Sequence, residues 1–171
     1  MSEIKKVLLN QARVLSKLCK QTFIVPHGHS APKKDIENYL KNNFSEEQLK
    51  QELRCSDNEY HFIHHQNKIA GFSKILFNSQ NENITVKNIT QLSRLYLLEE
   101  FYNLGLGKAL FDFNISLAQK NNQAGIWLAV WVENKRAISF YKKMGFKKIG
   151  TYNYKISESH SNPNYIFYLE I

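Results

Sequence analysis

Two glycines one residue apart, Gly105 and Gly107, interrupt the segment FYNLGLGKAL between an apolar run and an amphipathic stretch. The first N–H groups of a helix have no partner inside the helix and carry the positive end of its dipole. Glycine lets a ligand approach such a backbone closely. Lys108 adds a cation at a helix start, which is unfavourable unless an anion is bound there. The segment therefore predicts either a phosphate site or a simple turn into a helix.

Two common phosphate motifs do not fit this segment. A dinucleotide-binding GxGxxG needs a third glycine at position 110, which is Leu110. A P-loop needs Ser or Thr after Gly107-Lys108, where the chain has Ala109, and a glycine at position 102.

A second segment, NKRAISFYKKMGF at 134–146, follows about 25 residues later. Asn134 can cap a helix whose apolar stripe is Ala137, Phe140, Tyr141 and Met144. Gly145 is expected as the left-handed residue that ends this helix, with the apolar Phe146 after it. Spacing alone favours Tyr141 as a core aromatic.

Together the two segments resemble the GNAT N-acetyltransferases, whose acetyl-CoA site has a [Q/R]xxGx[G/A] motif opening one helix and N..A..FY.K.GF on the next. The matching residues are Gly105, Gly107, Asn134, Ala137, Phe140, Tyr141, Lys143, Gly145 and Phe146. The order of elements agrees with that family over nearly the whole chain. Tyr102 departs from the pattern, because it stands where the family usually has Gln or Arg to contact pyrophosphate.

The resemblance implies that acetyl-CoA (coenzyme A) lies between the strands LSRLYLL and AGIWLAVWV. Its expected contacts are backbone groups of Leu95, Tyr96 and Leu97, the amides of the loop and first helical turn, and side chains of the second segment. The remaining residues of this set are Leu104, Gly105, Leu106, Gly107, Lys108, Ala109, Asn134, Ala137, Phe140 and Lys143.

The resemblance also implies catalytic roles. Tyr141 is the position of the acid that protonates the leaving thiolate, and a backbone N–H near Leu97 could hold the thioester oxygen. The general base is left open among Glu133, Tyr96 and Glu99 acting through water, because Ser93 stands where many relatives carry Glu.

Several segments further resemble the PaiA-type spermine and spermidine acetyltransferases, which favours a polyamine or similar small amine as acceptor. The alternatives are a protein or peptide amine, or a CoA-binding regulatory or nucleic-acid-binding module without turnover. Glu46, Glu47, Glu52 and Asp57 could attract a polycation, but on an exposed helix they are expected to be solvated.

Regular patterns predict the elements that must position these residues. Asn10 is expected to cap a first helix running to Phe23, Pro26 and Gly28 to form a loop, Ser45 to restart a helix, and residues 66–67 to make a hairpin turn. The helix from Gly105 to Asn121 should bury Leu106, Leu110, Phe113 and Leu117. Strands are expected at 2–9, 59–66, 68–77, 88–98, 124–132, 146–156 and 164–171. This order indicates a single α/β (α+β) GNAT-like domain over 1–171, with a mixed sheet of about seven strands, helices on both faces and one splayed strand pair.

Composition narrows the class of protein. The net charge of +8 suits an anionic partner such as CoA, while lysines scattered along the chain disfavour nucleic acid. No apolar run could span a membrane, the first residues lack a signal-peptide core, and Cys19 and Cys55 have no pairing motif, so a cytoplasmic protein is expected. The chain has no metal motif, and HFIHH is interpreted as a polar strand face. A homodimer through the WLAVW run is left open.

Overall fold

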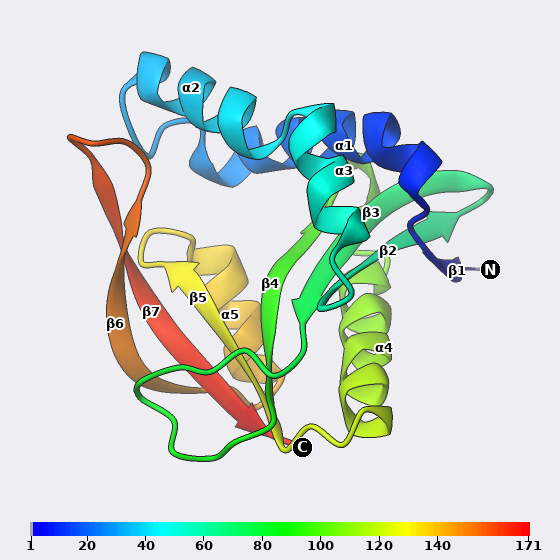
Figure 1. Ribbon diagram of the computed structural model, residues 1–171, viewed down its shortest axis with the longest axis vertical. Helices are drawn as coiled ribbons and strands as arrows, with labels where there is room; N and C mark the ends of the chain where they lie inside the picture. The colour runs from blue at the N-terminus through cyan, green and yellow to red at the C-terminus, as the bar shows by residue number, and fades with distance from the viewer. Residues whose placement is uncertain (1) are drawn as a thin grey trace.

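A seven-stranded mixed sheet organises the chain, as expected, with helices on both faces (Figure 1). The computed structural model describes residues 2–171. The strands are β1 (Ser2–Lys6), β2 (Asn58–His65), β3 (Lys68–Leu76), β4 (Ile89–Leu97), β5 (Gly125–Trp131), β6 (Lys147–Lys155) and β7 (Ser161–Glu170). The helices are α1 (Ala12–His27), α2 (Lys33–Asn43), α3 (Glu46–Arg54), α4 (Leu106–Lys120) and α5 (Lys135–Lys143), with short 3-10 turns at Leu9–Gln11 and Glu99–Phe101.

The strand order is β1-β2-β3-β4-β5-β7-β6, and all neighbours are antiparallel except β4 and β5. Gln66 and Asn67 both have positive φ, at 49° and 61°, which is the backbone of the tight hairpin turn expected between β2 and β3. The parallel β4–β5 pair needs a crossover, and α4 supplies it.

Strand alternation divides the core between the two faces. Phe62 and Phe72 pack with Leu15 and Leu49 under α1 and α3, whereas Ile63 on the next position of β2 packs against Leu110 of α4. A further cluster joins α4 and α5 to β5 and β7 through Phe111, Leu128, Phe146, Phe167 and their neighbours. Both sets of helices are therefore fixed to the sheet mainly by apolar contacts.

The boundaries of α1 differ from the prediction at both ends. A 3-10 turn precedes the helix, so Asn10 does not cap it and Gln11 occupies the N-cap position. The helix then continues through Pro26 to His27. A proline in the last turn removes one N–H donor, and the turn is still closed by the Gly28 N–H, which donates to the Ile24 carbonyl at 2.8 Å.

The buried stripe of α4 is also rotated from the prediction. Asn114 and Ala118 face the sheet, while Phe113 and Leu117 are only half-buried. Asn114 can be buried because its side chain accepts from Ser73 Oγ at 3.2 Å and donates to the Leu110 carbonyl at 2.6 Å.

Other local signals are confirmed. Ser45 Oγ accepts from the Gln48 N–H as the N-cap of α3. Gly145 has φ +94° directly after α5, so it has the left-handed conformation predicted for it. The final strand begins at Ser161, earlier than expected, and it includes Pro163, whose carbonyl accepts from the Val132 N–H at 3.0 Å. Within residues 2–171 there is no helix with the length and apolar character needed to cross a membrane.

Candidate active site

β4 and β5 pair over only three residues each, Ile89–Gln91 against Gly125–Trp127, and then diverge (Figure 1). The register of β4 against β3 also shifts at Lys74 and Ile75, which makes Ser93 an extra residue in β4. Along the diverging edges the backbone N–H and C=O groups have no strand partner, so a ligand that lies between the strands can hydrogen-bond to them.

Two cavities adjoin at this gap. The α4–α5 cavity lies against the first turn of α4 and one side of α5, and the α1 cavity lies against the last turn of α1 and the start of β7. Five residues line both cavities: Leu95, Tyr96, Asn134, Ala137 and Tyr141. A ligand in one cavity can therefore meet a ligand in the other beside Tyr141.

The start of α4 borders the α4–α5 cavity. Gly105 is its N-cap with φ +74°, and no side chain caps the first N–H groups. A Cβ on Gly107 would lie 3.7 Å from Leu97 Cδ1 and 3.8 Å from Phe140 Cε2, and so would fill part of the cavity. The uncapped amides and the space at Gly107 fit the binding of a phosphate group.

Arg136 brings a cation to the same cavity. Its guanidinium carbon lies 3.4 Å from the ring centre of Tyr102, and both residues line the cavity. Partial burial raises the pKa of Tyr102, so the ring stays neutral and holds the guanidinium by a cation–π contact. Among residues 2–171 no carboxylate forms an ion pair with Arg136. Arg136 was not among the predicted site residues, although it lies four residues, about one helical turn, before Phe140, which the resemblance places at the cofactor.

Two predicted cations lie elsewhere. Lys108 pairs with Asp112 at 2.6 Å on the exposed face of α4, so its charge at the helix start has a partner within the helix. Lys143 is exposed on the outer face of α5, beside Lys135 and Ser139. Two residues after Tyr141 a helix has turned by about 200°, so the structure does not bring Lys143 to either cavity.

The other predicted cofactor residues are close to the gap. Those that line the α4–α5 cavity are Leu95, Tyr96, Leu97, Gly107, Asn134, Ala137, Phe140 and Tyr141. The rest form the entry and first turn of α4: Leu104 is exposed, Gly105 caps the helix, Leu106 is buried in the core, and Ala109 donates its N–H to the Gly105 carbonyl.

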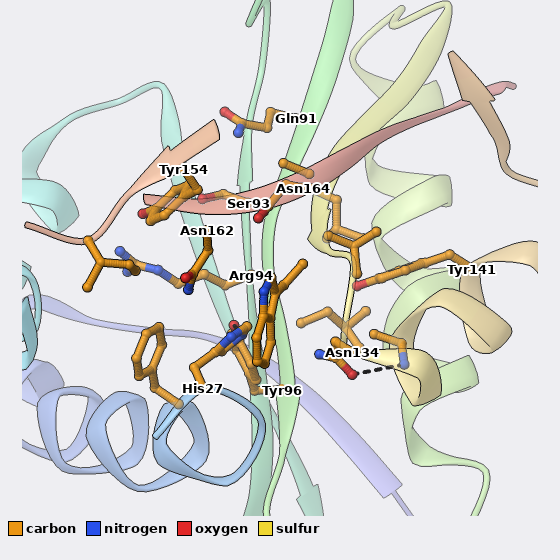
Figure 2. Close-up of a pocket in the computed structure, with 18 of the residues that line it drawn as sticks. His27, Gln91, Ser93, Arg94, Tyr96, Asn134, Tyr141, Tyr154, Asn162 and Asn164 are labelled. Atoms are coloured by element: carbon orange, nitrogen blue, oxygen red, sulfur yellow. Dashed lines mark hydrogen bonds between the residues drawn. The ribbon is translucent and has the colours of Figure 1, made fainter. Parts of the chain in front are cut away.

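Tyr141 is held by a capped helix. Asn134 Oδ1 accepts from the Ala137 N–H at 3.2 Å, as its predicted role as N-cap requires. Tyr141 is 8% exposed, and burial, with a smaller effect of Tyr96, raises the pKa of its hydroxyl. The hydroxyl points into the α1 cavity (Figure 2) and has no hydrogen-bond partner in the part of the chain that the structure describes. It is a protonated group available to a ligand.

His27 and Tyr96 form a neutral pair in the α1 cavity, which has a volume of about 160 Å³. Tyr96 Oη lies 3.3 Å from His27 Nε2, and the His27 ring centre lies 5.7 Å from that of Trp131. Burial, and to a lesser extent His29, lowers the pKa of His27 to about 4. His27 was not among the predicted site residues because it was expected in a loop, whereas the extra turn of α1 carries it into the cavity (Figure 2).

The three residues left open as the general base lie at different positions relative to the two cavities. Tyr96 lines both cavities and Glu99 lines the α4–α5 cavity. Glu133 is exposed, lies 3.6 Å from Lys135 and lines neither cavity.

The Glu52 side chain is only 13% exposed, which corrects the expectation that it is solvated on α3. Its Oε2 lies 2.6 Å from Lys74 Nζ and 3.5 Å from Arg94 Nη1, and it accepts a hydrogen bond from the Tyr60 hydroxyl. Burial alone would raise the pKa of Glu52, but Arg94 and Lys74 hold it below its usual value. We call Glu52, Tyr60, Lys74 and Arg94 the Glu52 cluster.

No group of three or more His, Cys, Asp or Glu side chains within residues 2–171 could hold a metal ion. His61 of the HFIHH segment packs against the Phe113 ring with centres 4.7 Å apart, and His65 packs against Phe101.

Comparison with known proteins agrees with this geometry. The model of the acetyltransferase (GNAT) family matches residues 27–146, which include β4, α4, β5 and α5. An N-acetyltransferase of the pepI 3′ region from Lactobacillus delbrueckii subsp. lactis is 25% identical over 142 residues, covering 82% of each chain.

Solved structures share the fold at low identity. The PaiA N-acetyltransferase from Thermoplasma acidophilum, in complex with coenzyme A, superimposes with a TM-score of 0.79 at 20% identity and covers 100% of this chain and 99% of its own. The ribosomal-protein-S18-alanine N-acetyltransferase from Escherichia coli gives a TM-score of 0.71 at 19% identity, covering 100% and 94%.

The pKa of His27 predicts how stability changes with pH. Its value is about 4 in the folded protein against the usual 6.5, so between these values the unfolded chain binds more protons. The free energy of unfolding should therefore fall as the pH is lowered from about 6.5 to about 4. In urea titrations at these two pH values, the free energy of unfolding of His27→Gln should fall less than that of the wild type when the pH is lowered.

His29→Gln is the matched control, because it removes an exposed imidazole and only the smaller cause of the shift. It should keep most of the pH dependence of the wild type. An equal loss of stability in His27→Gln and the wild type would contradict a lowered pKa for His27.

Proposed function

This chain belongs to the GNAT family of acetyltransferases, and from that premise we propose that its acceptor is the primary amine of a small molecule that enters the α1 cavity. The protein is an acetyl-CoA-dependent N-acetyltransferase. The observation that supports the proposed acceptor site is the position of Tyr141, which lines both cavities and directs its hydroxyl into the α1 cavity.

The α4–α5 cavity fits acetyl-CoA, which supplies the acetyl thioester. The unpaired edge of β4 at Leu95–Leu97 offers backbone groups to an amide-containing arm. The amides from Leu104 to Lys108 and the Arg136 guanidinium offer donors to phosphate oxygens, whereas the Ala109 N–H is already used by the Gly105 carbonyl. Tyr102 lacks the N–H donors that the usual Gln or Arg would offer to pyrophosphate, but it holds Arg136, which has such donors.

Two proton movements are required of this chain's own residues. An alkylamine has a pKa of about 10 and must lose a proton before it attacks. The neutral His27–Tyr96 pair can accept and pass on that proton within the α1 cavity. Tyr141 keeps its proton at neutral pH and can donate it to a leaving thiolate, whose thiol has a pKa of about 8.5.

The size and lining of the α1 cavity favour a small acceptor. The rings of His27, Tyr96 and Trp131 provide an apolar surface that also attracts an ammonium group. A polyamine, the acceptor favoured by the sequence, is one member of this class and stays a prediction. A peptide N-terminus is the second candidate, since a structural neighbour is named as an enzyme for a ribosomal-protein alanine.

The experiment is to incubate the protein with acetyl-CoA and a panel of alkylamines, polyamines, amino acids and short peptides while thiol release is monitored. Release should depend on a small primary amine. Protein that binds CoA but releases no thiol with any amine would contradict this function. Turnover of peptides alone would favour a peptide N-terminus, the second candidate, as the acceptor.

Tyr141→Phe tests the acid. Turnover should fall by roughly a hundredfold while the affinity for acetyl-CoA stays close to that of the wild type, because only the donated proton is lost. Steady-state kinetics and direct CoA titration separate the two effects. Tyr152→Phe, which removes an exposed hydroxyl, is the control. Unchanged turnover in Tyr141→Phe would rule out its role as the acid.

Arg136→Gln tests the phosphate contact. The KM for acetyl-CoA should rise about tenfold with little change in kcat, because a charge-assisted hydrogen bond is lost. The KM for acetyl-pantetheine, which lacks the pyrophosphate, should be unaffected. Lys142→Gln, on the exposed side of the same helix, is the matched control. An equal rise for both thioesters would show that Arg136 acts through structure alone.

A further inference from the structure

We propose that the acceptor is an aliphatic primary amine that also carries a carboxylate, and that Arg94 binds this carboxylate in the α1 cavity. The inference rests on the proposed function, because it names the chemical class of the molecule that the α1 cavity receives. The proposed function does not distinguish diamines and polyamines from amino acids as acceptors. The inference does, because it favours acceptors that carry a carboxylate.

Two nitrogen atoms of the Arg94 guanidinium have no hydrogen-bond acceptor within residues 2–171. It lies on β4 two residues before Tyr96, lines the α1 cavity, and its side chain is 13% exposed. Nη1 is used by Glu52 and Tyr60, while Nε and Nη2 donate to no acceptor within residues 2–171. Neither of these two atoms is fully enclosed by protein, and Arg94 is one of the residues that line the α1 cavity. An arginine with two free donors presents the geometry that binds a carboxylate through paired hydrogen bonds.

The charges around Arg94 are unbalanced. The Glu52 cluster contains one carboxylate for two cations, and the Tyr60 hydroxyl is kept neutral because burial raises its pKa. Arg94 stays charged, and its guanidinium lies 4.7 Å from the Phe44 ring centre, which limits its movement. An incoming carboxylate would balance the excess positive charge, whereas a second ammonium would add to it.

The other residues that line the α1 cavity also favour a carboxylate over a second ammonium group. No Asp or Glu lines the α1 cavity within the described residues 2–171. Its uncharged polar groups include Ser93, Asn162 and Asn164, and His27 is neutral. A polycation would find aromatic rings here but no carboxylate to neutralise its remaining ammonium groups. The reacting amine itself loses its proton, so it needs no anionic partner.

The test compares three acceptors of equal chain length in the wild-type protein: an ω-aminoalkanoate, the corresponding alkylamine and the corresponding diamine. Several chain lengths are used, because the position of the amine relative to Arg94 must suit the cavity. For the best length, kcat/KM for the aminoalkanoate should exceed both others by at least about tenfold, as expected for a charge-assisted hydrogen bond.

The results of this comparison distinguish a failure of the proposed function from a failure of the role of Arg94. Thiol release from none of the amines contradicts the proposed function itself. Release with the alkylamine or the diamine at an efficiency equal to or above that of the aminoalkanoate keeps the proposed function and overturns the role of Arg94.

Arg94→Gln tests the residue. The ratio of kcat/KM for the aminoalkanoate to that for the alkylamine should fall by about tenfold. Because both values are measured in one preparation, a smaller folded fraction does not change the ratio. Arg13→Gln, which removes an exposed arginine of α1, should keep the wild-type ratio. An unchanged ratio in Arg94→Gln would overturn the assignment.

A measurement on the wild type covers the case in which Arg94→Gln does not fold. A simple alkanoate without an amine should inhibit competitively against the amine acceptor, while the alkanol of equal length should inhibit at least about tenfold less. Equal inhibition by the two would overturn carboxylate binding.

Discussion

The site depends on one loss of pairing: β4 and β5 share three residue pairs and then separate. Each strand remains fixed on its other side, β4 by β3 and β5 by β7, so the gap is held open by the rest of the sheet. The separated edges leave backbone groups unpaired inside the protein, which is costly unless a ligand or water uses them. Helices packed on both faces close the ends of the gap and turn it into two cavities that share Tyr141.

Burial and charge then give the residues of the two cavities different properties. Tyr141 and His27 are kept neutral because an apolar environment disfavours their charged forms. Two arginines lie beside the gap: Arg136 against the ring of Tyr102, where phosphates are proposed to bind, and Arg94 in the Glu52 cluster. Both cations depend on neighbouring aromatic rings for their position, Tyr102 for Arg136 and Phe44 for Arg94. The net charge of +8 thus includes two arginines for which we propose particular anions, beside many exposed lysines.

Local signals in the sequence were reliable where a few neighbouring residues control the backbone. The cap at Asn134, the left-handed Gly145 and the hairpin at 66–67 could all be predicted, because each depends on residues within one turn. Patterns that required knowledge of packing were less accurate. Phe113 was expected in the core of α4, but Asn114 is buried instead, since Ser73 of β3 supplies its hydrogen-bond partner. Pro26 was expected to end α1, but the following Gly28 closes the turn.

The sequence by itself therefore determined the family, the fold class and the backbone elements of the proposed acetyl-CoA site, because those features depend on short motifs with fixed spacing. It could not place His27, Arg136 or Arg94, nor show that Lys143 and Glu133 face away. These positions depend on the rotation of each helix and on the divergence of two strands more than thirty residues apart. Only the tertiary structure fixes them, since side chains from α1, β4 and α5 converge through packing contacts between distant segments of the chain.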